Sequence, residues 1–258
     1  AINRPPVIAR TATPPAVKWF PPARTGLIAG LVVSGFGLAS VYASPLATRL
    51  IEVYGLPTTL LILGIAFLVL VVGLAQLLQP PPKGYVPAGS PAAKGPGVVA
   101  KREDFRPMEM LGTGQLYVCW LLYAVGAGAG LMVIPQLATA VAKQADLAKF
   151  GFWLVVACGV GNGAGRIVAG MLSDKLGRRL TLQACFLFQA AVLILFSMAL
   201  PNSAAGSLPV MSCLSALVGA NYGANLSLFP SITKDYYGLK NFGVNYGLVF
   251  TAWGFGGF

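Results

Sequence analysis

One arginine lies inside a long apolar run of the sequence, where charged residues are rare. Arg166 is the only Lys, Arg, Asp or Glu well inside any of the long apolar runs of the sequence. A charge at membrane depth is costly unless it is paired, so it marks a functional site by default. Because a guanidinium can hold a carboxylate with two parallel hydrogen bonds, we predict that Arg166 binds an anion. The structural alternative is that its long side chain reaches the membrane surface near Asp174, about 12 Å away along a helix.

Polar and aromatic residues at helical spacing accompany this arginine. Asn162 precedes it by one turn, and Tyr222 and Asn225 share one face of a helix. A mostly apolar cavity with a few polar groups is typical of small-molecule sites. For each aromatic residue, ordinary packing between helices is the alternative. The residues that we expect to bind substrate together with Arg166 are Asn162, Tyr222, Asn225, Phe250 and Trp253.

A second chemical signal is a basic turn between two apolar runs. Gly170 would let two helices approach closely, and Gly177 would permit a tight turn with positive φ. Asp174 is expected to accept hydrogen bonds from the amino end of a neighbouring helix, or to pair with a basic side chain. We predict a cytoplasmic gate, and an ordinary basic turn is the alternative. The residues of this gate motif are Gly170, Asp174, Lys175, Gly177, Arg178 and Arg179.

Several kinds of chemistry are missing from the sequence. It contains no His, which excludes His-based catalysis, His metal ligation and His proton relays in this chain. The four Cys are far apart in apolar stretches and are interpreted as small buried hydrophobes. No nucleophile–base pair or metal-ligand cluster is visible, so we expect no enzyme, no metal site and no cofactor. The seven acids lie in predicted loops or at the ends of apolar runs, which favours exchange or uniport over proton symport.

The composition indicates which elements position these residues. Of the 258 residues, 56% are apolar and 10% are charged, whereas soluble domains carry roughly 25% charged residues. A transmembrane helix needs about 20 mostly apolar residues. We therefore predict an all-α membrane protein with six full transmembrane helices and a partial seventh. The apolar runs lie at 26–48, 57–79, 113–141, 150–172, 180–200 and 207–231, and another begins near 243.

A polar connection at 80–112 divides the chain. It is rich in Pro, Gly and basic residues, which is typical of a linker. We expect residues 1–79 to hold two transmembrane helices at the end of an amino-terminal bundle, 80–112 to be a cytoplasmic linker, and 113–258 to form most of a carboxy-terminal bundle. Residues 105–111 are expected to form a short amphipathic helix. Because the chain starts at Ala1 and stops inside an apolar run, we interpret it as a piece of a longer protein.

The basic residues predict the topology. Fourteen of the 18 Lys and Arg fall on one side of the predicted spans and three on the other, which places the basic side in the cytoplasm. The net charge of +11 is explained by topology and by attraction to anionic lipid, so no nucleic-acid partner is expected. We expect a monomer in the plasma membrane, with the lipid bilayer and a small organic anion as its partners.

The turn at 170–179 resembles the loop signature of the major facilitator superfamily. That signature occurs between the second and third helices of the family and, in a weaker copy, between the eighth and ninth. Two apolar runs and a basic linker precede the pair of runs that flanks the turn, so the second placement fits. The resemblance implies a truncated fold of this superfamily, from the fifth helix to part of the eleventh. It also implies alternating access, with the Asp174 turn as a latch.

Further matches resemble the oxalate/formate antiporter group of this superfamily. The matching segments are Trp19-Phe20-Pro21 with Arg24 and Gly26-Leu27-Ile28-Ala29-Gly30, then Asn162-Gly163-Ala164-Gly165-Arg166, Leu228-Phe229-Pro230-Ser231 and Asn245-Tyr246-Gly247. Thr25 is an extra residue in the first of these segments. The resemblance implies that Arg166 takes the role of the substrate-binding arginine in the eighth helix of the oxalate carrier.

One departure from the oxalate-type pattern limits the substrate. Where that pattern has a lysine in the eleventh helix, this sequence has Trp253. A dianion would lose much of its charge compensation without this second cation. We therefore expect a secondary active transporter of small organic anions, with a monocarboxylate such as lactate, pyruvate or formate as its substrate. The alternatives are oxalate/formate exchange, a superfamily transporter of another substrate class, and a membrane sensor that does not transport.

Overall fold

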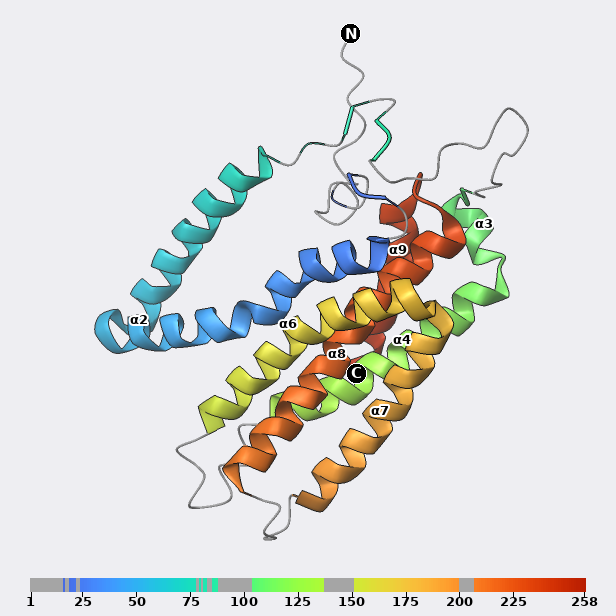
Figure 1. Cartoon of the computed structure of the whole chain (residues 1–258). Helices are drawn as coiled ribbons and strands as arrows, with labels where there is room; N and C mark the ends of the chain where they lie inside the picture. The colour runs from blue at the N-terminus through green and yellow to red at the C-terminus, as the bar shows by residue number, and fades with distance from the viewer. Residues whose placement is uncertain are drawn as a thin grey trace, which may run out of the picture.

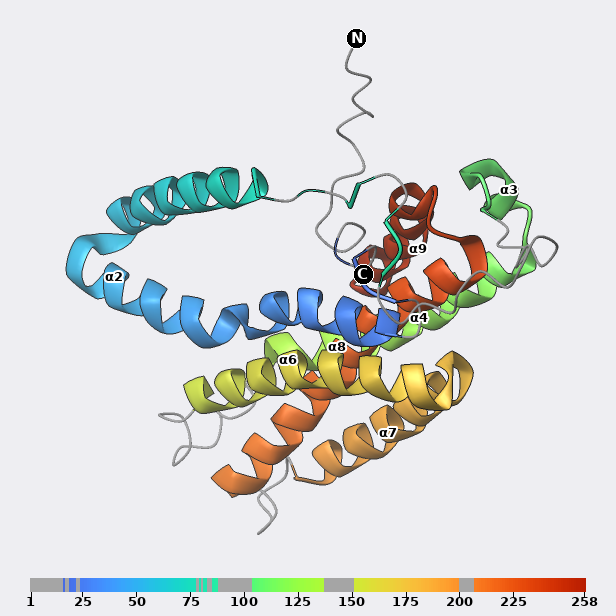
Figure 2. The ribbon, with the colours of Figure 1, turned by 45° about the horizontal axis from the view of Figure 1, so that its top comes forward.

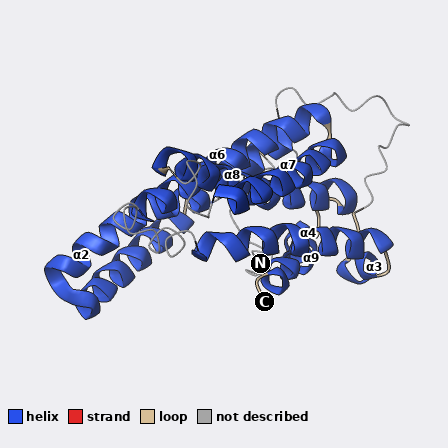
Figure 3. Cartoon of the chain, turned by 90° about the horizontal axis from the view of Figure 1, so that it is seen from below, coloured by secondary structure: helices blue, strands red, loops and turns tan. Residues whose placement is uncertain are grey.

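Figure 1 shows the protein as a computed structural model, which describes residues 16, 19–21, 24–77, 79, 81–82, 85–87, 104–136, 151–199 and 207–258. Every regular element in these residues is helical, as Figure 3 shows, so the all-α prediction is confirmed. The elements are α2 (Thr25–Ala75), α3 (Pro107–Leu111), α4 (Gly114–Val133), the 3₁₀ helix η3 (Ile134–Gln136), α6 (Gly151–Leu176), α7 (Arg178–Ala199), α8 (Leu208–Tyr237) and α9 (Phe242–Gly256).

Helix α2 contains two of the predicted membrane spans. It is 51 residues long, but Gly55 leaves the helical conformation with a φ of 74° and a ψ of 167°. A positive φ costs glycine little, so the chain can turn back at this position. Figures 1 and 2 show the result, a helical hairpin whose second arm lies away from the other helices. Leu61 and Leu68 on this arm are 63% and 65% exposed, which suits a surface that faces lipid or further helices.

The first arm of α2 packs closely against α6, and α6 packs against α8. A Cβ atom added to Gly26 would lie 2.5 Å from the carbonyl oxygen of Gly170. In the same way, a Cβ at Gly165 would collide with the carbonyl of Ala220 on α8. Small residues at these crossings let the backbones touch, which is the usual packing of helices in a membrane.

Helix α8 is the central helix of the bundle. It packs against α2, α4, α6, α7 and α9, and most of its side chains are buried. Polar residues of membrane helices face the interior of a bundle, so a central helix can carry many of them. Its polar residues explain why α8 is not among the helices that are long and apolar enough to cross a membrane. Within the described residues there are four such helices, Thr25–Ala75, Gly114–Gln136, Trp153–Leu176 and Arg178–Met198.

Two boundaries bear on the predictions. The short helix expected at 105–111 is present as α3, where the Glu109 carboxylate accepts the N–H of Arg106 at 2.7 Å. The sixth apolar run, however, was placed too short at 207–231, because α8 continues through Pro230 to Tyr237. Neighbouring groups in a helix bundle make an interior proline tolerable. Lys234, which follows the predicted run, consequently lies in a helix and is only 4% exposed.

Parts of several predicted segments lie outside the described residues. The longest are 1–15 of the amino-terminal segment, 88–103 of the linker and 137–141 at the end of the third apolar run. The division into an amino-terminal bundle at 1–79, a linker at 80–112 and a carboxy-terminal bundle at 113–258 stays a prediction.

Candidate functional site

Arg166 is fully buried where α6 crosses the first arm of α2. Its Nε donates a hydrogen bond to Oδ1 of Asn162 at 3.0 Å, and its Nη1 donates to the carbonyl of Val33 at 2.6 Å. The ring of Phe36 covers the guanidinium, with 5.1 Å between Cζ and the ring centroid. Among the described residues, Nη2 has no hydrogen-bond partner and no carboxylate forms an ion pair with the side chain. Within the described part of the chain, the buried cation is therefore oriented by neutral groups alone.

A cavity of about 300 Å³ lies beside Arg166, on the side away from the Asp174 turn. Two of its wall residues, Asn162 and Phe36, also contact the guanidinium. The cavity is thus next to the charge, while these two side chains separate it from the guanidinium. The other wall residues include Ser40 of α2, Leu131 of α4, Ile134 of η3, Cys158 of α6 and Tyr222 of α8.

The aromatic residues predicted for the site reach the cavity through Tyr222. The Tyr222 hydroxyl accepts a hydrogen bond from Nε1 of Trp253 at 2.7 Å. Phe250 stacks on Trp253 with 5.5 Å between the ring centroids and 6° between the planes. Neither Phe250 nor Trp253 lines the cavity, so Trp253 is connected to it through Tyr222, and Phe250 only through Trp253. Asn225 faces Gly126 of α4 instead, and its Nδ2 donates to the carbonyl of Asn221 at 3.1 Å.

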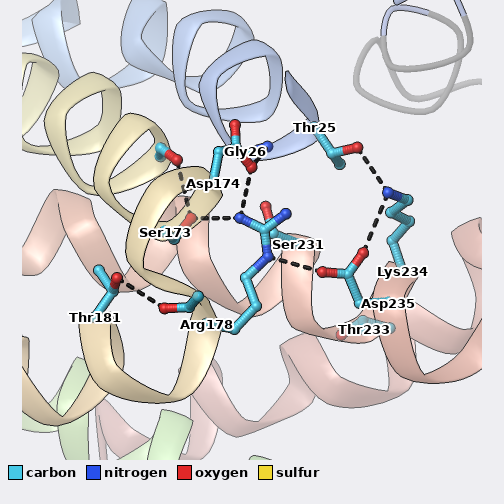
Figure 4. Close-up of polar contacts among 12 residues, drawn as sticks. Thr25, Gly26, Ser173, Asp174, Arg178, Thr181, Ser231, Thr233, Lys234 and Asp235 are labelled. Atoms are coloured by element: carbon cyan, nitrogen blue, oxygen red, sulfur yellow. Dashed lines mark hydrogen bonds and ion pairs between the residues drawn. The ribbon is translucent and has the colours of Figure 1, made fainter. Parts of the chain in front are cut away.

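At the other end of α6, the Asp174 carboxylate caps the amino end of α2. Its Oδ1 accepts the backbone N–H of Gly26 at 2.9 Å, and both residues are labelled in Figure 4. Its Oδ2 accepts the backbone N–H of Leu27, also at 2.9 Å. The first N–H groups of a helix have no partner within the helix and carry partial positive charge, so a carboxylate is well suited to them. Both interactions expected for Asp174 from its sequence are present, because it also pairs with Arg178.

Arg178 connects this cap to α8. Its Nη1 lies 2.8 Å from Asp174 Oδ1 and donates also to the hydroxyl of Ser173, while its Nε donates to Asp235 Oδ2 at 2.8 Å. Lys234, beside Asp235 on α8, donates from Nζ to Thr25 Oγ1 at 2.6 Å (Figure 4). Two polar connections therefore tie the amino end of α2, one from α6 and one from α8.

The rest of the gate motif forms the turn itself. Gly177 has a φ of 90°, a conformation that other residues rarely adopt, and its carbonyl accepts the hydroxyl of Thr181 at 2.9 Å. Gly170 meets Gly26 with almost no space between the backbones. Lys175 and Arg179 are exposed.

Several contacts at these sites have no signal in the sequence. The carbonyl of Val33 and the ring of Phe36 belong to an apolar run, where nothing distinguishes them from packing residues. Asp235 and Lys234 were visible as charges at the end of a predicted span, but their partners lie on other helices. Thr25 appeared only as an extra residue, whereas its hydroxyl holds Lys234.

Close glycine contacts between helices and a buried arginine that faces the interior of the bundle are typical of membrane proteins built from packed helices. A family model described as the Major Facilitator Superfamily matches residues 11–258. The chain belongs to the major facilitator superfamily and is an integral membrane protein of this family of transporters. The family resemblance drawn from the turn at 170–179 is thereby confirmed.

Two relatives are informative. The chain is 29% identical over 245 residues to an uncharacterized MFS-type transporter, YhjX, of Escherichia coli K12. This alignment covers 93% of the chain and 56% of the relative. The chain is also 29% identical over 247 residues to the oxalate:formate antiporter of Oxalobacter formigenes. That alignment covers 92% of the chain and 54% of the relative. The chain therefore spans about half the length of these relatives.

Proposed function

We propose that the full-length protein is a secondary transporter of small monocarboxylates, and that Arg166 binds the carboxylate. The observation that carries this proposal is the buried guanidinium beside the 300 Å³ cavity, with Nη2 free of partners among the described residues. An always-charged group held by neutral partners gains most from an anion in a site of low dielectric. The similarity to an oxalate:formate antiporter supports an anionic substrate.

The number of cations favours a monoanion over a dianion. Among the described residues, Arg166 is the one Lys or Arg in contact with the wall of the cavity. Trp253 occupies the position at which the oxalate-type pattern has a lysine, and it donates its hydrogen bond to the neutral Tyr222. One guanidinium neutralises lactate, pyruvate or formate, whereas oxalate would retain an uncompensated charge in the cavity.

The substrate must displace a side chain to reach the guanidinium. Phe36 and Asn162 lie between the cavity and Arg166, and Nη2 is not accessible from outside. A carboxylate that enters the cavity would replace the contact with Phe36 by two charge-assisted hydrogen bonds, which are stronger than the cation–π contact. This rearrangement couples binding to a movement between α2 and α6.

The same two helices meet at the latch, which suggests how transport proceeds. The Asp174 end is closed by hydrogen bonds, and the cavity lies on the other side of Arg166. In alternating access, one bundle rocks against the other around a central site. We propose that the Asp174 cap is broken and remade in each cycle, in the plasma membrane and by a monomer. Exchange or uniport is our proposed mode, because no Asp or Glu lines the cavity in the described part of the chain.

Uptake by the reconstituted full-length protein tests this function. Vesicles loaded with lactate, or with no anion, would be supplied with radiolabelled lactate, pyruvate, formate or oxalate. We expect monocarboxylate uptake that internal lactate stimulates, and weaker uptake of oxalate. Tight uptake of oxalate in preference to lactate would replace our proposal with oxalate/formate exchange, which the relative from Oxalobacter formigenes favours.

A further inference from the structure

A buried lysine joins α8 to the first residue of α2. Lys234 is 4% exposed and Thr25 is 3% exposed, so the chain itself encloses the contact between them. The Nζ of Lys234 donates a hydrogen bond to Oγ1 of Thr25 at 2.6 Å and lies 3.1 Å from Oδ1 of Asp235. An ammonium is costly to bury unless it is paired and hydrogen-bonded. Both partners therefore hold Lys234 in place between the two helices.

The polar contacts at this end of the bundle form a closed ring. Asp235 faces Lys234 with Oδ1, and its Oδ2 accepts the Nε of Arg178 at 2.8 Å. Arg178 in turn holds Asp174, whose carboxylate accepts the backbone N–H of Gly26. The ring thus starts and ends at adjacent residues of α2 and passes through α8, α7 and α6. Its members, all labelled in Figure 4, are Thr25, Lys234, Asp235, Arg178, Asp174 and Gly26.

The closed ring couples the two connections to α2. Because Thr25 and Gly26 are neighbours in the chain, a movement that takes Gly26 away from Asp174 also takes Thr25 away from Lys234. Hydrogen bonds weaken steeply with distance and angle, so both connections are lost over the same small movement. Asp235 adds a second coupling, since one carboxylate positions both Arg178 and Lys234.

We propose that Thr25 and Lys234 are positioning residues that make the latch a single lock between α2, α6 and α8. In this lock, the Asp174 cap and the contact between Lys234 and Thr25 break together when this end of the bundle opens. Neither residue belongs to the gate motif at 170–179. The proposal rests on the alternating access of the proposed function, but not on the identity of the substrate.

The reactivity of a buried position next to the ring tests this lock in the full-length protein. Ala29 lies one turn after Thr25 on α2 and is 1% exposed, so the thiol of Ala29→Cys is protected while the latch is closed. The rate at which a water-soluble maleimide labels this thiol would be measured in detergent, with the other cysteines replaced by serine. Thr25→Val keeps the shape of the side chain but removes the hydroxyl. We expect it to raise the labelling rate about tenfold, the effect of one hydrogen bond to a charged group.

Two matched variants separate the hydroxyl from packing. Thr25→Ser keeps the hydroxyl and should label as slowly as the unmodified lock. Thr233→Val removes an equally buried hydroxyl beside Lys234 that bonds to the carbonyl of Phe229 within α8, and should also label slowly. Equal labelling of Thr25→Ser and Thr25→Val would assign the effect to packing and overturn the role of the hydroxyl. A melting curve of each variant checks that it is folded.

Asp174→Asn distinguishes a failure of this proposal from a failure of the latch itself. We expect it to speed labelling too, and the double variant with Thr25→Val to show less than the product of the two single effects, because the connections are coupled. Unchanged labelling in both single variants would refute the latch and with it the lock. Faster labelling in Asp174→Asn alone would refute only the role of Thr25 and Lys234. Faster labelling in Thr25→Val alone, or single effects that multiply in the double variant, would show independent connections and overturn the single lock.

Discussion

The carboxylate of Asp174 accepts the backbone N–H of Gly26 at 2.9 Å, across 148 positions of the sequence. This bond and its companion to Leu27 make α6 the cap of α2, so the two helices on which the candidate site depends are joined at one end. Each hydrogen bond is charge-assisted, but it depends steeply on distance and angle. A small tilt between the two helices therefore breaks both bonds. That combination suits a contact that has to hold one state and then release it.

Replacing Asp174 by Asn should weaken this end of the protein. An amide has one acceptor oxygen, so it cannot cap both N–H groups and also neutralise Arg178. Hydrogen bonds to charged groups contribute about 1.5–3 kcal/mol each, so we expect Asp174→Asn to lower the melting temperature by a few degrees and to slow transport. Glu52→Gln, an equal charge change at an exposed position on α2, should alter neither. A melting temperature unchanged by Asp174→Asn would argue against the cap.

The space around each glycine predicts different effects for substitutions at Gly170 and Gly35. A Cβ at position 170 would meet the carbonyl of Gly26, so Gly170→Val must push α6 away from α2, at a cost of about 1–3 kcal/mol. Gly35 on α2 has open space around its Cβ direction, so Gly35→Ala should be neutral or slightly stabilising. Thermal unfolding of both variants in the same detergent measures the difference. The close approach is wrong if Gly170→Val melts like the unmodified protein.

Arg178 should not be replaceable by lysine. Its Nη1 and Nε hold Asp174 and Asp235 at 2.8 Å each, which uses the fixed fork of the guanidinium. The single ammonium of Arg178→Lys cannot match that fork, so we expect transport to fall about tenfold. Arg49→Lys, at an exposed position of α2, is the matched control. Normal transport by Arg178→Lys would mean that charge alone matters at this turn.

Trp253 offers a test of selectivity. Trp253→Lys places a second cation behind Tyr222, which should raise the ratio of oxalate uptake to lactate uptake about tenfold. Trp253→Phe removes the hydrogen bond to Tyr222 without adding charge, and should leave the ratio near its original value. Competition between the two labelled anions in vesicles gives the ratio directly. An equal shift in both variants would assign the effect to packing.

The sequence predicts where the helices lie better than it predicts which residues of different helices contact one another. Apolar runs of about 20 residues are sufficient to place membrane helices, and the turn at Gly177 follows from glycine and charge at fixed spacing. Helix α8 was harder to delimit, because Pro230 suggests an end where bundle packing allows the helix to continue.

In the candidate site, too, the sequence identifies some residues but not the contacts that they make with other helices. Arg166 stands out as a lone charge in an apolar run, and Asn162 follows from the helical repeat. Phe36 and Val33 contact Arg166 from α2, about 130 positions away, and a single sequence contains no signal of such a contact. Asn225 shares a helix face with Tyr222, and both side chains contact α4, Asn225 at Gly126 and Tyr222 at Gly130. Only Tyr222 lines the cavity, because Asn225 lies one turn further along α8.

Lactate exchange by Arg166→Gln tests the central claim most directly. Vesicles containing the full-length protein and internal lactate would be given labelled lactate. Arg166→Lys would be measured in parallel, because it keeps the positive charge but removes the guanidinium that can make two parallel hydrogen bonds. We predict a loss of at least about a hundredfold in Arg166→Gln, as expected when one partner of a buried charge pair is removed, and partial activity in Arg166→Lys. Melting curves would confirm that each variant is folded. Undiminished exchange by a folded Arg166→Gln variant would show that Arg166 does not bind the substrate.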